Sequence, residues 1–275
     1  MTGFGVRAAA ELIFTGATCG SLGVQVVLRR LAFFTETLGH VAFLGIVAAT
    51  IVGSDIKLGA AVAAAGAVAL SGRGRIASGQ PGRQSGILVS GALALGVVLI
   101  SSRQGFSKDL TAALVGSPLT VTTGDIVVAG IVAACVVAVL AAVHKELLLA
   151  AFDPHVTQAF GYPARLIDTG LLSLLAVTVV TAAPAIGATL PLALLVGPSA
   201  TALLWTRRVV PATVLGGLLA AGSAAAGLVL SLHYRLAASA ASAILCGALF
   251  LLTLAAVRLG HLMAVFTRRQ AAGPI

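Results

Sequence analysis

Long apolar runs recur along the whole 275-residue chain, and they constrain its fold more than any other feature. Hydrophobic residues make up 59% of the sequence and charged residues only 9%, whereas a soluble domain carries about 25% charged residues. A helix of about 20 apolar residues is long enough to cross the hydrocarbon layer of a bilayer. The sequence therefore predicts an all-α, polytopic transmembrane helix bundle, a multi-pass protein of the cell membrane in contact with lipid.

The apolar runs predict about nine spans within one membrane domain that covers residues 1–275. They lie at residues 8–28, 31–53, 57–71, 86–102, 125–143, 166–184, 186–205, 209–232 and 236–257. The third run is short and the sixth and seventh meet at Pro184, so eight or ten spans are alternatives. Between the runs we expect a flexible inner loop at 71–85, an outer segment at 102–125 and an inner segment at 144–165.

The basic residues predict the orientation of the chain. If the N-terminus is outside, twelve of the 17 lysines and arginines fall in cytoplasmic segments and five in outer ones. Short cytoplasmic loops of membrane proteins are enriched in lysine and arginine, so the N-terminus is expected outside and the C-terminus in the cytoplasm. The net charge of +9 is explained by these loops, and we expect no nucleic-acid partner.

Two ionisable residues, Glu36 and His40, interrupt the second apolar run. A helix that starts after Arg30 would place His40 about 15 Å into a hydrocarbon layer about 30 Å thick. Ionisable side chains at that depth are rare and usually line a pathway for an ion or a substrate. The spacing of four residues puts both on one helix face, where a carboxylate and an imidazole can bind one Mn²⁺, Zn²⁺ or Fe²⁺ ion. The alternative is a hydrogen-bonded pair that only joins helices.

Other polar residues have less specific interpretations. Glu11 lies near the outer end of the first span, where an interfacial or subunit-contact role is preferred and an entry vestibule is the alternative. No nucleophile–base constellation is present, so we expect no enzyme activity. The pattern G-x-x-x-x-G-K-[ST] is also absent, so ATP hydrolysis by that route would need a separate subunit.

The inner segment at 144–165 contains a helix-start signal. Asp153 followed by Pro154 places a capping residue and a proline where a helix begins, and Gly161 would end this short helix. Three apolar side chains recur at helical spacing: Phe152, Val156 and Phe160. Such a helix can dock into a groove on a partner protein, although an ordinary connector between two spans is the alternative.

Five segments, in this order, resemble the metal-type permeases of ABC importers: residues 20–33, 36–45, 114–125, 145–161 and 187–202. The chain differs from the usual family pattern at Glu36, where aspartate is more frequent, and at Leu44, where proline is usual.

The resemblance implies a subunit that carries manganese, zinc or iron inward by alternating access past Glu36 and His40. Two permease copies, expected as a homodimer, form the pathway, and an extracytoplasmic metal-binding protein delivers the ion. Cytoplasmic ATP-binding subunits use the ATP, so no cofactor beyond the transported metal is expected on this chain. The residues implied to couple to these subunits are Glu146, Phe152, Asp153, Pro154, Val156, Phe160 and Gly161.

Two other kinds of transporter are alternatives. A permease for a metal chelate such as a siderophore or cobalamin would need a wide pathway and no ligand pair. A secondary transporter driven by an ion gradient would show an inverted repeat and helices broken at the midplane, and we find neither clearly.

Overall fold

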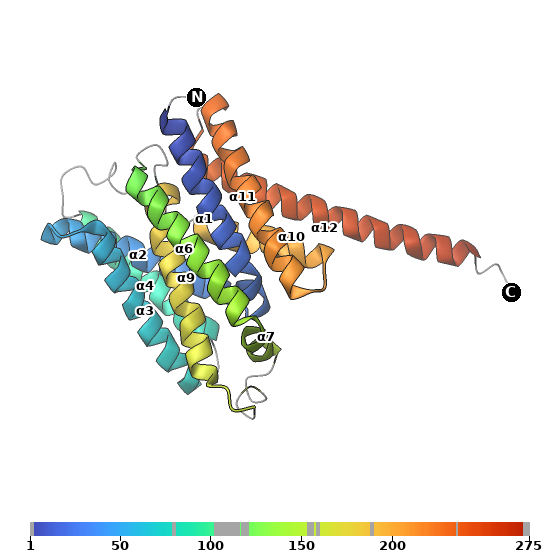
Figure 1. The fold of residues 1–275 in the computed structure, drawn as a ribbon, viewed down its shortest axis with the longest axis horizontal. Coiled ribbons are helices and arrows are strands. Elements are labelled where there is room, and N and C mark those ends of the chain that lie inside the picture. Colours follow the sequence, from blue (N-terminus) through green and yellow to red (C-terminus); the bar gives the residue numbers. More distant parts are fainter. Residues whose placement is uncertain are drawn as a thin grey trace.

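A computed structural model describes residues 3–78, 81–101, 116, 121–152, 157, 160–187, 190–234 and 236–271. Within these ranges every regular element is a helix, as the apolar runs predicted (Figure 1). The helices are α1 (Gly3–Leu28), α2 (Ala32–Val52), α3 (Ile56–Ser78), α4 (Pro81–Ser101), α6 (Thr123–Ala142), α7 (His144–Phe152), α9 (Ala164–Ile186), α10 (Leu190–Trp205), α11 (Val209–Tyr234) and α12 (Ala238–Ala271).

Six of these helices are long and apolar enough to cross a membrane: α1, α2, α6, α9, α11 and α12. Three shorter apolar stretches, Ile56–Ser71, Ser85–Leu99 and Leu190–Trp205, lie where the sequence predicted the third, fourth and seventh spans. In lipid every backbone polar group needs an internal partner, which is why such runs become helices. The count of nine spans and the orientation stay predictions.

The structure corrects several predicted boundaries. The flexible loop expected at 71–85 is wrong, because α3 continues to Ser78 and α4 begins at Pro81. A proline fits the first turn of a helix, where its missing N–H is not needed. Likewise α9 does not end at Pro184 but runs to Ile186, where Gly187 with φ 77° ends it. The last helix, α12, extends to Ala271 and not to residue 257.

Helix α1 packs closely against α11 and α10 through glycines. A Cβ atom at Gly20 would overlap the carbonyl group of Gly216 on α11, and one at Gly23 would overlap the carbonyl group of Leu195 on α10. The hydroxyl of Ser199 donates a 2.9 Å hydrogen bond to the carbonyl oxygen of Gly20. Small residues allow this approach, which stabilises helix pairs in lipid by van der Waals contact.

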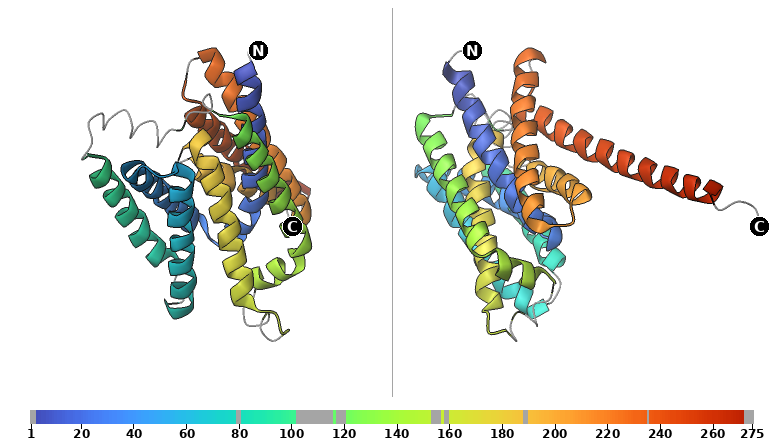
Figure 2. Two further views of the ribbon diagram at one scale, coloured as in Figure 1. Left: turned by 60° about the vertical axis from the view of Figure 1, so that its left-hand side comes forward. Right: turned by 45° about the vertical axis from the view of Figure 1, so that its right-hand side comes forward.

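Helix α2 forms an antiparallel hairpin with α3 and also packs against α4 and α9 (Figure 2). The hairpin turn contains Gly53, whose φ of 75° lies in the left-handed region that favours glycine. A Cβ atom at Gly45 would overlap the carbonyl oxygen of Gly59, so this pair too is in close contact. Helix α12 packs on α10 and α11 and then extends away from the other helices (Figure 1).

Candidate metal pathway and coupling site

The predicted metal ligands lie in the N-terminal half of α2. This 21-residue helix begins at Ala32, so Glu36 and His40 are its fifth and ninth residues. At 1.5 Å per residue, His40 is about 12 Å from the start of a helix about 31 Å long. Both side chains are half-buried, and the spacing of four residues places them on the same face of α2.

Neither ligand candidate is hydrogen-bonded within the part of the chain that the structure describes. The Nδ1 atom of His40 is buried without a partner there, and the side chain of Glu36 forms no hydrogen bond or ion pair with another of those residues. Buried polar atoms usually have a partner, so an isolated one suggests water or an ion. The alternative of a hydrogen-bonded pair that joins helices has no such bond to support it here.

The pair by itself supplies only two ligands. Among the described residues, no group of three or more His, Cys, Asp or Glu side chains lies close enough to hold a metal. Two ligands would leave the other coordination positions to water or to a second protein chain. Weak coordination of this kind suits a site that an ion must leave again.

Two large apolar cavities lie along α9, away from Glu36 and His40. One, of about 620 Å³, lies between α3, α6 and α9, and the other, of about 630 Å³, lies between α6, α7 and α9. The two cavities share lining residues in α6 and α9, including Val132 and Ser173. Neither cavity is lined by the predicted metal ligands.

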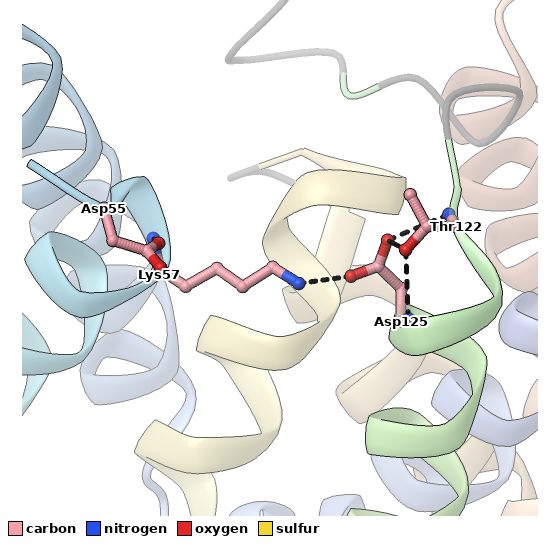
Figure 3. A network of polar contacts seen from close by, with 4 residues as sticks. All are labelled: Asp55, Lys57, Thr122 and Asp125. Atoms are coloured by element: carbon pink, nitrogen blue, oxygen red, sulfur yellow. Dashed lines mark hydrogen bonds and ion pairs between the residues drawn. The ribbon is translucent and has the colours of Figure 1, made fainter.

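A polar network lies at one end of the first cavity, where Asp55, Lys57 and Asp125 belong to its lining (Figure 3). The ammonium group of Lys57 on α3 forms an ion pair with Asp125 at the start of α6. Asp125 also accepts hydrogen bonds from the Thr122 N–H at 2.9 Å and hydroxyl at 2.6 Å, while its own N–H donates to Thr122 Oγ1 at 3.3 Å. These reciprocal bonds form a capping box at the start of α6. At the start of α3, Asp55 accepts a 2.8 Å hydrogen bond from the Lys57 N–H. The capping pattern Thr122-x-x-Asp125 is visible in the sequence and is a signal for the start of this helix.

Glu11 lies inside the bundle and not at its surface. Its side chain on α1 is only 1% exposed, and its Oε2 atom has no hydrogen-bond partner within the described ranges. The charged groups that interact with it electrostatically are Asp125 and Lys57, in the first turns of α6 and α3. An interfacial role, which the sequence favoured, therefore does not fit its burial.

The coupling residues divide into those that the structure places and those outside its described ranges. Asp153, Pro154 and Val156 lie outside them. The others lie in or beyond α7: Glu146 is half-buried, Phe152 is 77% exposed, Phe160 is 70% exposed, and Gly161 has a φ of 80°. Two large aromatic side chains are thus exposed close to one another in sequence, at the end of α7 and shortly after it.

The structure adds Arg29, which lies within the resembling segment 20–33 but was not among the predicted site residues. Arg29 lies at the junction of α1 and α2, and its side chain is 4% exposed. Nη1 contacts Asp168 Oδ1 on α9 at 2.6 Å, and Nη2 donates to the carbonyl oxygen of Leu147 on α7 at 2.7 Å. These partners are 139 and 118 residues away in sequence, so no local pattern could have revealed them.

Comparisons with known proteins agree with the fold. The sequence profile described as ABC 3 transport family matches residues 1–257. The chain is 31% identical over 249 residues to a protein of Halalkalibacterium halodurans named manganese transport system membrane protein MntC, covering 90% of this chain and 85% of that one. It is 27% identical to a probable iron transport system membrane protein of Haemophilus influenzae, covering 86% and 88%.

A solved structure is also similar. PsaBC from Streptococcus pneumoniae in complex with Fab has a TM-score of 0.81 and 26% sequence identity, covering 92% of this chain and 91% of that one. The family profile spans nearly the whole chain, and both relatives are named as membrane proteins of metal transport systems. The chain therefore belongs to the ABC 3 transport family, the metal-type permeases of ABC importers, and is a multi-pass protein of the plasma membrane.

Proposed function

We propose that this chain is the permease subunit of an ATP-driven importer of a divalent transition-metal ion, which passes Glu36 and His40 by alternating access. The observation that carries the proposal is the position of this pair on α2. Both groups are half-buried, share one face and lack hydrogen-bond partners among the described residues. Ionisable groups in a membrane span usually mark a transport pathway.

The donor atoms restrict the cargo to a small set of metals. A carboxylate oxygen and an imidazole nitrogen suit Mn²⁺, Fe²⁺ or Zn²⁺, and the lack of a thiolate argues against Cu⁺. Manganese is the first ion to test, because one of the relatives above is named for it. A metal chelate is the alternative cargo, and it would not need the Glu36–His40 pair.

The proposal includes an assembly and an orientation. One permease domain over residues 1–275, with nine spans, the N-terminus outside and the C-terminus inside, would pair with a second copy around the pathway. Cytoplasmic ATP-binding subunits would contact the segment at 144–165, and an extracytoplasmic metal-binding protein would deliver the ion. Glu11, buried near Lys57 and Asp125, would belong to the entry vestibule.

Metal uptake into proteoliposomes that contain the permease, its ATP-binding subunit and the binding protein tests the pathway. We expect Glu36→Gln and His40→Gln each to abolish ATP-dependent Mn²⁺ accumulation, because each removes one of only two protein ligands. Matched controls are Asp55→Asn and His233→Gln, an exposed carboxylate and an exposed imidazole on the outer side, which should transport normally. Normal uptake in both pathway variants would refute the role of the pair.

Competition identifies the cargo. Excess Fe²⁺ or Zn²⁺ should reduce Mn²⁺ uptake if the site takes hydrated ions, whereas inhibition only by a chelated metal would favour the alternative. For the vestibule, Glu11→Gln should lower uptake at limiting Mn²⁺ more than at saturating Mn²⁺. An equal effect at both concentrations would count against a role in entry.

Co-purification tests the coupling segment. Replacing the two exposed aromatic residues, Phe152→Ala with Phe160→Ala, should reduce the amount of ATP-binding subunit bound to the permease, because exposed aromatic side chains contribute strongly to interfaces. Tyr234→Ala removes an equally exposed aromatic side chain from the outer side and is the control. Unchanged stoichiometry in the double variant would argue against docking at these residues.

A further inference from the structure

The side chain of Arg29 connects three helices at the inner end of the bundle. It belongs to the α1–α2 junction, contacts Asp168 in the first turns of α9, and donates to the Leu147 carbonyl of α7. The guanidinium is a planar fork with fixed donors, so it holds two acceptors at once in a defined geometry. A link of this kind is stiff and depends on direction, unlike a contact between apolar side chains.

The backbone next to Arg29 is equally well defined. The Leu31 N–H donates to the Val26 carbonyl at 2.8 Å, and the Arg30 N–H donates to the Val27 carbonyl at 3.3 Å, which is the Schellman pattern at a helix end. Arg30 has a φ of 55°, in the left-handed region that residues other than glycine seldom adopt. Helix α2 then begins at Ala32, so a displacement of Arg29 is passed to α2 through a short, hydrogen-bonded turn.

Arg29 therefore lies between two parts of the proposed machinery. Leu147 belongs to α7 and Asp168 follows the inner segment at 144–165, where the ATP-binding subunits are proposed to contact the permease. Glu36 is only seven residues beyond Arg29, on the helix that carries both metal-ligand candidates. Besides the direct packing of α9 on α2, one path from the contact with the ATP-binding subunits to the metal pair thus passes through a buried, hydrogen-bonded side chain.

We infer that Arg29 is a positioning residue that transmits the ATP-driven movement of the cytoplasmic segment to α2, and so to Glu36 and His40. This inference rests on the proposed function. Without Arg29, α2 would follow the movement of α7 and α9 only through apolar packing, and less metal would be transported for each ATP hydrolysed. The Asp168 side chain is 42% exposed, so water can solvate its carboxylate when Arg29 is replaced, and the fold should survive the substitution.

Three variants separate coupling from folding. Arg29→Lys keeps the charge but loses the fork, so it can reach one acceptor and not both. Arg29→Gln removes the charge as well, and Asp168→Asn alters only the partner on α9. The matched control is Arg30→Gln, which removes the neighbouring charge from an exposed side chain in the same turn.

The assay measures ATP hydrolysis and Mn²⁺ uptake on the same proteoliposomes. We expect Mn²⁺ transported per ATP hydrolysed to fall about tenfold in both Arg29 variants, within the range of typical coupling between sites, and to fall less in Asp168→Asn. Hydrolysis and the amount of assembled complex should stay close to those of the original protein and of Arg30→Gln. A parallel loss of hydrolysis, uptake and assembled complex, or an unchanged ratio, would overturn the inference.

A second measurement does not depend on the cargo. Spin labels at Phe33→Cys in the first turn of α2 and Val214→Cys on α11, both exposed sites, report the displacement of α2 when ATP is added to a complex without other cysteines. We expect the label distance to change in the original complex and to stay constant with Arg29→Lys. An equal change in both, or no change in the original complex, would overturn the inference. If Mn²⁺ uptake is absent while the label distance responds as expected, the proposed cargo fails and the role of Arg29 stands.

Discussion

The contact of α1 with α11 offers a sharp test, because the same substitution at two glycines should have opposite effects. In Gly20→Ala the new Cβ atom would lie 2.7 Å from the Cβ of Ala220 and would overlap the carbonyl group of Gly216. Carbon atoms normally approach to about 3.5–4.0 Å, so the two helices must separate by about 1 Å. That movement also stretches the hydrogen bond from Ser199 to the Gly20 carbonyl, which measures 2.9 Å.

The expected magnitude follows from these contacts. Overpacking costs about 1–3 kcal/mol and a weakened hydrogen bond about 1 kcal/mol, against a gain of about 0.5–1 kcal/mol from replacing a helical glycine by alanine. We therefore expect Gly20→Ala to destabilise the protein by about 2–3 kcal/mol. Gly222→Ala on α11 is the control. No atom lies within 4 Å of its new Cβ, so this variant should show only the stabilisation that comes from replacing a helical glycine by alanine.

Thermal unfolding in detergent, monitored at one fixed scan rate, measures the difference. A loss of about 2–3 kcal/mol should lower the midpoint by roughly 4–10 °C, while Gly222→Ala should leave it unchanged or slightly raised. The fixed rate matters because large membrane proteins often unfold irreversibly. If Gly20→Ala unfolds at the same temperature as Gly222→Ala, α1 and α11 are not as close as described.

Three further outcomes are expected. Asp125→Ala removes both the cap of α6 and the ion pair with Lys57, so it should lower the free energy of unfolding by about 1–2 kcal/mol. Lys57→Ala removes only the ion pair, from a side chain that is 62% exposed, and should lower it by less than about 1 kcal/mol. Equal shifts of the unfolding midpoint in the two variants would contradict this difference. Glu36→Asp keeps a carboxylate at the pathway, so Mn²⁺ uptake should persist, and complete loss would mean that the longer side chain is required. A lipid-soluble maleimide should modify the exposed Cys135 and spare the two buried cysteines, as mass spectrometry of the folded protein can verify.

The sequence predicted most of the helices because the requirement behind them is local. Each apolar run in lipid must satisfy its own backbone, and a helix does so within the run. The wrong predictions concern helix boundaries, which the apolar runs define less well than the helices themselves. In the glycine-, serine- and arginine-rich stretch at 71–85, α3 continues to Ser78 and α4 begins at Pro81, and Gly187, not Pro184, ends α9.

The candidate site was predictable to the same extent. Glu36 and His40 are four residues apart, so their shared face follows from helix geometry alone, and tertiary structure adds only their burial and missing partners. Glu11 could not be placed in the same way. Its burial depends on helices from distant parts of the chain, which no local pattern in the sequence reveals.

What the sequence determined by itself was the class of structure, the membrane environment and the one ionisable pair within the second apolar run. These follow from composition and short spacings, which set the free energy of each segment in lipid independently of the others. Only the tertiary structure decided which charges meet. Lys57 pairs with Asp125 across 68 positions and Arg29 with Asp168 across 139, because pairing depends on how helices from different parts of the chain pack together.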